Sequence, residues 1–101
     1  MTEILNVAKG YAEDIEEAYE NGELIEYIDE HALDIEYTIS GNMDYLGVSI
    51  AVALGGPSVY INTREKCVEA YWGGESATYT LDSDVVEELD YFYEDYYLSM
   101  R

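Results

Sequence analysis

The sequence predicts an α+β fold: an antiparallel sheet of four to five short strands, with N-terminal helices and a C-terminal helix packed on it. Three observations support this prediction. Apolar residues recur every three or four positions at both ends of the chain, as on the buried face of a helix. In the middle of the chain they alternate with polar residues, as in strands. The connections between the strand segments are short, which makes neighbouring strands antiparallel.

The length predicts a single domain over residues 1–101. A chain of 101 residues can build one hydrophobic core and is too short for two. Apolar residues make up 49% of the chain, which is enough to form that core despite the high charge.

Two helices are expected at the N-terminus, over residues 2–20 and 23–30. Asn21 and Gly22 end the first of them, because glycine readily takes the left-handed conformation found after many helices. The side chains expected to face the core are Ile4, Ala8, Tyr11, Ile15, Ala18, Leu24, Ile25 and Ile28.

Strands are expected over residues 34–39, 45–54, 58–62, 67–72 and 76–81, separated by turns rich in glycine, serine and asparagine. The segment 45–54 should be the most buried. Its large side chains should share one side, and its small ones should form a second side close enough for a helix to pack on. The large ones are Leu46, Val48, Ile50, Val52 and Leu54, and the second side holds Tyr45, Gly47, Ser49, Ala51 and Ala53.

The last twenty residues predict a helix with one apolar and one acidic face. Four tyrosines in this helix cannot all face one core, so one or two of them should be exposed beside the acids. The expected apolar stripe is Val85, Leu89, Phe92, Tyr96 and Met100.

Charge limits the classes of partner. There are 23 Asp and Glu against 4 Lys and Arg, for a net charge of −19. Such a polyanion gains nothing from counterion release on nucleic acid and is repelled by an anionic membrane, so its natural partner is a basic protein. The net charge is −11 over residues 1–37, −2 over residues 38–81 and −6 over residues 82–101, so the acids concentrate on the predicted helices. Solubility alone requires a far smaller net charge, of magnitude about 2–8.

Carboxylates four positions apart on a helix lie about 6 Å apart, a spacing comparable with that of charges along a nucleic-acid strand. The acidic helices therefore predict phosphate mimicry. Exposed tyrosine adds contact area that can stack on arginine. The candidate partner-binding residues are Glu13, Glu16, Glu17 and Glu20 on the first helix, and Asp84, Glu87, Glu88, Tyr91, Glu94 and Asp95 on the last.

The chain's small size, acidity, tyrosines and clustered acidic helices resemble the small DNA-mimic inhibitors of phages and mobile elements, the anti-CRISPR and anti-restriction proteins. The stretches 55–61 and 71–74 are also similar to segments of small proteins of mobile elements. This resemblance implies a non-enzymatic inhibitor, a monomer or homodimer, that blocks the nucleic-acid groove of a CRISPR effector or restriction enzyme in the cytoplasm of a bacterial host. Two alternatives remain open: an immunity protein or antitoxin that neutralises a basic toxin, and a salt-adapted acidic domain.

Catalysis and cofactors are not expected. His31 and Cys67 fall on different predicted elements, and nothing in the sequence activates the thiol. One histidine and one cysteine are too few for a structural zinc site, and no EF-hand spacing is present. No apolar run approaches 18 residues and no export signal is evident, so a cytoplasmic protein without a membrane span is expected.

Overall fold

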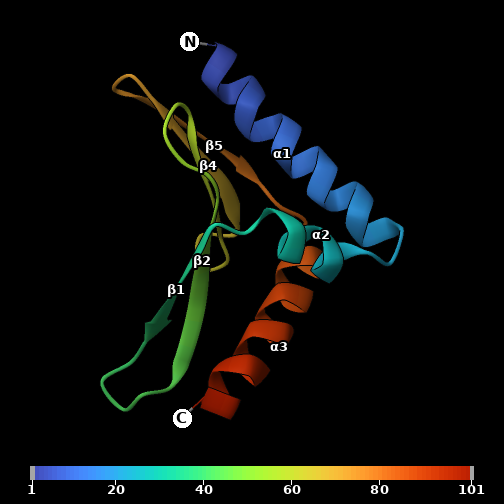
Figure 1. Cartoon of the computed structure of the whole chain (residues 1–101), viewed down its shortest axis with the longest axis vertical. Helices are drawn as coiled ribbons and strands as arrows, with labels where there is room; N and C mark the ends of the chain where they lie inside the picture. The colour runs from blue at the N-terminus through green and yellow to red at the C-terminus, as the bar shows by residue number, and fades with distance from the viewer. Residues whose placement is uncertain (1, 101) are drawn as a thin grey trace.

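Three helices lie on one side of a five-stranded antiparallel sheet in the computed structural model, which describes residues 2–100 (Figure 1). The fold is α+β, as predicted. The elements are α1 (Thr2–Glu20), α2 (Leu24–His31), β1 (Asp34–Ile39), β2 (Tyr45–Ala53), β3 (Ser58–Asn62), β4 (Cys67–Trp72), β5 (Glu75–Thr80) and α3 (Ser83–Met100).

The strands follow one another across the sheet in chain order, β1 to β5, each antiparallel to the next. Helix α1 packs on β4 and β5, and α3 packs on β2. Figure 1 shows both outer hairpins leaning away from the helices, so the sheet is bent with its open side facing away from the helical layer. None of the helices within residues 2–100 combines the length and apolar character needed to cross a lipid bilayer.

The core lies between the helices and one face of the sheet. Alternate strand residues reach it because side chains in a strand point to opposite faces in turn. Gly22, at φ 72°, ends α1 as predicted, and the backbone N–H of Glu23 donates to the carbonyl oxygen of Ala18 at 2.8 Å. The core includes Ala8, Ala12, Ile15, Leu24, Ile28, Val48, Ile50, Val59, Ile61, Val68, Ala70, Val85 and Leu89.

Strand β2 differs from the expected pattern at both ends. Leu46 and Leu54, expected in the core, are 44% and 54% exposed. The pairing of β2 shifts by one residue at each end, against β1 between Thr38 and Ile39 and against β3 near Val52. An extra residue in one strand reverses which side chains face the core, because side chains in a strand point to the two faces in turn.

A helix was expected to lie against the small second side of β2, but its middle residues, Ser49 and Ala51, line a groove on the face of the sheet that no helix covers. Tyr45, at the start of the strand, does meet a helix, through its hydrogen bond to Asp90 of α3.

Helix α3 buries a different stripe in its C-terminal half. Phe92 and Tyr96, expected in the core, are 40% and 52% exposed, and Tyr93 and Tyr97 are buried instead. The reason is a cluster of tyrosines that joins α3 to β1 and β2. The ring centroids of Tyr97 and Tyr37 are 5.7 Å apart, and the Tyr97 hydroxyl donates to the Met43 carbonyl oxygen at 2.8 Å. Met100, the last member of the expected stripe, is exposed as well.

Candidate binding surface

The acids predicted on α1 and α3 are on the surface, with one exception. Glu13, Glu17 and Glu20 are exposed, whereas Glu16 is partly buried. The Glu16 carboxylate accepts a hydrogen bond from the backbone N–H of Asp82 at 3.1 Å, just before α3 begins. Glu16 therefore ties the start of α3 to α1, so it has a structural contact in addition to its charge.

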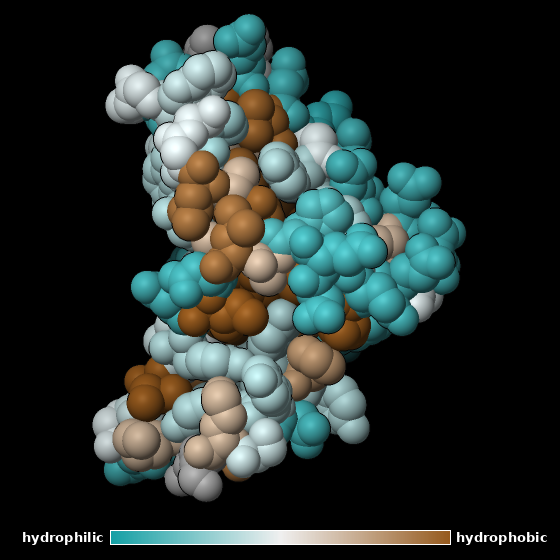
Figure 2. Space-filling view, viewed as in Figure 1, coloured by the Kyte–Doolittle hydropathy of each residue, from teal (hydrophilic) through white to brown (hydrophobic). Residues whose placement is uncertain are grey.

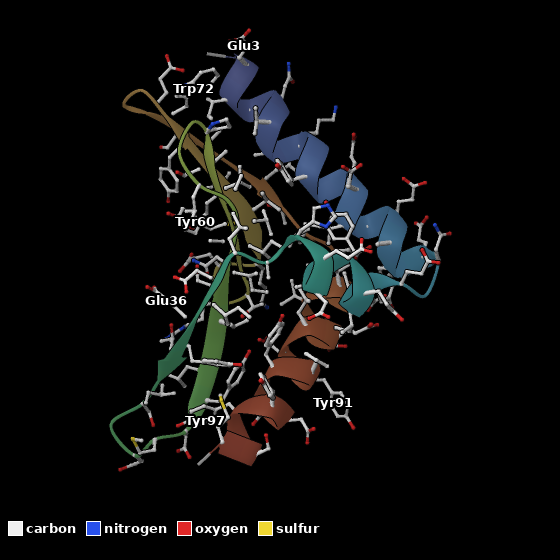
Figure 3. The ribbon with its side chains drawn as sticks, viewed as in Figure 1. Glu3, Glu36, Tyr60, Trp72, Tyr91 and Tyr97 are labelled. Carbon is white, nitrogen blue, oxygen red and sulfur yellow. The ribbon has the colours of Figure 1, made fainter. Side chains whose placement is uncertain are left out.

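Four of the predicted residues of α3 line a hollow of about 480 Å³, to which α1 contributes Tyr19 and none of its predicted residues. Figure 3 shows Tyr91 pointing outward from α3, away from the sheet, and its side chain is 81% exposed. Partial burial raises the pKa of the Tyr19 phenol, and the nearby carboxylates, led by Asp84, raise it further. Negative charge from α3 therefore converges on a residue of α1. The hollow is lined by Tyr19, Asp84, Glu87, Glu88 and Tyr91.

Helix α2 supplies acids that the sequence analysis did not select. Glu23, Glu26 and Glu30 line a second hollow of about 320 Å³, together with Ala18 and Tyr27. Figure 2 shows hydrophilic side chains gathered over α2 and the C-terminal half of α1. The sequence could have indicated that α2 belongs to the acidic region, because only three residues connect α1 to α2 and keep their acids close together.

Glu94 and Asp95 are exposed but lie apart from this group. Figure 1 shows the C-terminal half of α3, on which they lie, running away from α1. Like Glu13, Glu17 and Glu20 on α1, they line neither hollow. We call the exposed acids of α1, α2 and the N-terminal half of α3, with two neighbouring tyrosines, the acidic helical surface. It comprises Glu13, Glu17, Glu20, Glu23, Glu26, Glu30, Asp84, Glu87 and Glu88, with Tyr19 and Tyr91.

The acids of the acidic helical surface have no basic partner in the described part of the chain. Among residues 2–100, no carboxylate forms an ion pair with a lysine, arginine or histidine. Lys9 is exposed on α1 without an ion pair to any residue from 2 to 100, and Arg64 and Lys66 belong to the turn between β3 and β4. A surface with one sign of charge and no internal counterions projects a field that attracts cationic groups of another molecule. No protein-family model, curated protein or solved structure matches this chain.

His31 and Cys67 form no hydrogen bond with each other in the part of the chain that the structure describes. In the tautomer protonated at Nδ1, His31 donates to the carbonyl oxygen of Tyr27 at 2.8 Å, and its ring stacks on the Tyr27 ring. Cys67 is buried in β4, and burial, reinforced by the charges of Glu69 and Glu65, raises the pKa of its thiol. A raised pKa opposes formation of the reactive thiolate. Within the described part of the chain, no group of three or more His, Cys, Asp or Glu side chains is arranged to hold a metal ion.

Proposed function

We propose that this protein is a non-enzymatic inhibitor whose acidic helical surface occupies the nucleic-acid groove of a basic host-defence protein, a CRISPR effector complex or a restriction enzyme. The observation that carries the proposal is the concentration of exposed carboxylates on three helices, without an ion pair among residues 2–100.

The chemistry of such a groove matches this surface. Grooves that bind nucleic acid place lysine and arginine against phosphates, and much of the binding free energy comes from these contacts. Rows of carboxylates at helical spacing offer those side chains comparable partners. Tyr91 adds an exposed ring at the margin of the acids, on which an arginine of the groove can stack.

The unequal distribution of charge favours this proposal over salt adaptation, which would spread acids evenly. The exposed acids concentrate on the helices, whereas residues 38–81, which include β2 to β5, have a net charge of only −2. A general need for solubility does not explain this segregation.

The experiment compares two triple charge reversals in an inhibition assay on purified CRISPR effectors and restriction enzymes. The first changes Glu13, Glu17 and Glu20 to lysine and leaves Glu16 in place, because Glu16 holds Asp82. The matched control changes Asp44, Glu65 and Glu75, which are exposed and lie outside the helices, so the net charge changes equally. We expect the first variant to lose inhibition and the control to retain most of it.

Equal loss in both variants would mean that net charge alone matters, and full inhibition by both would place the contact elsewhere. Circular dichroism of each variant checks that the fold is intact. Inhibition of a basic toxin, with no effect on any DNA-binding enzyme, would contradict the proposal in favour of an immunity protein.

A further inference from the structure

The face of the sheet that no helix covers contains a groove of about 530 Å³. Figure 3 shows Glu36 and Tyr60 on this side, pointing away from the helices. The groove is therefore separated from the acidic helical surface by the full thickness of the sheet and core. Its lining is Asp34, Glu36, Ser49, Ala51, Leu54, Ser58, Tyr60, Glu69 and Tyr71.

Strand register explains why these side chains meet. One row across the sheet pairs Asp34 with Ala51, Ala51 with Tyr60, and Tyr60 with Glu69. Side chains of directly paired residues share a face, with Cβ atoms about 5 Å apart. The small side chain of Ala51 thus lies at the bottom of the groove. Asp34 on β1 lies on one side of it, and Tyr60 on β3 and Glu69 on β4 lie on the other. In the next row Glu36 pairs with Ser49, which repeats the arrangement of acid and small residue.

The far wall of the groove is held in place by its own contacts. One carboxylate oxygen of Glu69 accepts a hydrogen bond from Asn62 Nδ2 at 3.1 Å, and the other accepts one from the Tyr71 hydroxyl at 3.3 Å. The rings of Tyr60 and Tyr71 meet edge to face, with centroids 5.9 Å apart. A binding surface fixed in this way loses little conformational entropy when a ligand arrives.

The same face already accommodates the stem of an arginine. Gly47 pairs with Thr38, one row beyond Glu36 and Ser49, and a Cβ at Gly47 would overlap Cγ of Arg64. The aliphatic part of Arg64 therefore lies against Gly47 of β2. Arg64 forms no ion pair among residues 2–100, so the groove acids keep their charge for another cation.

We propose that this groove, the open-face groove, docks an arginine side chain of a basic protein segment. The guanidinium group lies between the carboxylates of β1 and Glu69, and its plane stacks on Tyr60. Charge complementarity favours a cation, and the combination of an aromatic ring with carboxylates favours arginine over lysine, because guanidinium is planar and can bind a carboxylate through two parallel hydrogen bonds. This contact goes beyond the proposed function, since it lies on the opposite side of the molecule.

The probe is the peptide acetyl-Gly-Arg-Gly-amide, titrated into the full-length ¹⁵N-labelled protein and followed by ¹H–¹⁵N correlation spectra. The lysine peptide of the same design is the comparison. We expect chemical-shift changes at the amides of Ser49, Ala51, Tyr60 and Glu69, and roughly three- to tenfold weaker binding of the lysine peptide. Changes confined to helical amides, or equal affinities for the two peptides, would overturn the proposal.

Two single variants test the named acids. Glu69→Gln and Glu36→Gln remove one negative charge each and keep the side-chain shape, and both should weaken the arginine peptide by roughly threefold or more. The Glu36 side chain forms no hydrogen bond with another residue among residues 2–100, so its variant stays informative if Glu69→Gln unfolds the protein. Glu75→Gln, on β5 and exposed, is the matched control and should bind normally. Unchanged affinity in Glu36→Gln, or an equal loss in Glu75→Gln, would refute the site.

Discussion

Replacing Tyr37 by phenylalanine should stabilise the protein. The Tyr37 hydroxyl is buried and has no hydrogen-bond partner among residues 2–100, whereas its ring lies among those of Tyr45, Tyr93 and Tyr97. Burying a hydroxyl without a partner costs about 1–3 kcal/mol. The void left by one oxygen atom is smaller than a methyl group and costs less than about 1 kcal/mol. The free energy of unfolding should therefore rise by on the order of 1 kcal/mol, with the ring contacts unchanged.

Tyr45→Phe is the matched control, because it removes a hydroxyl from the same tyrosine cluster. The Tyr45 hydroxyl donates to the Asp90 carboxylate at 2.7 Å, and its loss should cost about 1.5–3 kcal/mol, as for hydrogen bonds to charged groups. Urea unfolding followed by circular dichroism measures both variants. In a domain of this size, 1 kcal/mol also shifts Tm by about 4–8 °C. A Tyr37→Phe protein less stable than the wild type would refute the reasoning and would mean that the hydroxyl has a partner.

Three further predictions concern stability. Tyr93 is 4% exposed, so Tyr93→Ala should lower the free energy of unfolding by about 3–5 kcal/mol. Phe92→Ala, at the half-exposed neighbouring position, should lower it by less than about 2 kcal/mol, and equal losses in urea unfolding would contradict the observed orientation of α3. Added NaCl should raise Tm at pH 7, since it screens repulsion among carboxylates that lack ion pairs, and a Tm that ignores salt would show that the charges are already compensated. Burial raises the pKa of Tyr27 and Tyr93 to about 12, so these phenols keep their protons in the folded state after the unfolded chain has lost them. Their contribution to stability should be constant below about pH 10 and should fall between about pH 10 and 12, and Tm values that stay level between about pH 10 and 12 would contradict this prediction.

Local sequence pattern was sufficient to predict the elements of this fold. Residues 58–62 and 67–72 were predicted as strands and are strands, and Gly22 ends α1 as expected. Patterns of this kind depend on residues close together in the chain, so they can be read without knowledge of the tertiary structure. The exposure of one or two tyrosines on the last helix was predicted on the same grounds, and Tyr91 and Tyr96 are the exposed ones.

Features that depend on distant partners could not be predicted. Leu46 and Leu54 are exposed because β2 changes register against its neighbours, which the sequence of β2 alone does not reveal. Tyr97 is buried because its ring packs against those of Tyr37 and Tyr45, which lie on strands more than fifty residues earlier in the chain. The open-face groove was missed for the same reason, since the row that joins Asp34 to Glu69 exists only once four strands are paired.

The claim that the acidic helical surface substitutes for nucleic acid is tested most directly by competition. A labelled DNA duplex would be bound to the target enzyme, and its fluorescence anisotropy would be measured at several salt concentrations while the unlabelled acidic protein is added. The proposal predicts that the protein displaces the DNA, that its apparent Kd increases in proportion to the DNA concentration, and that its affinity falls steeply with salt. A ternary complex that holds DNA and protein together, each with unchanged affinity, would contradict it.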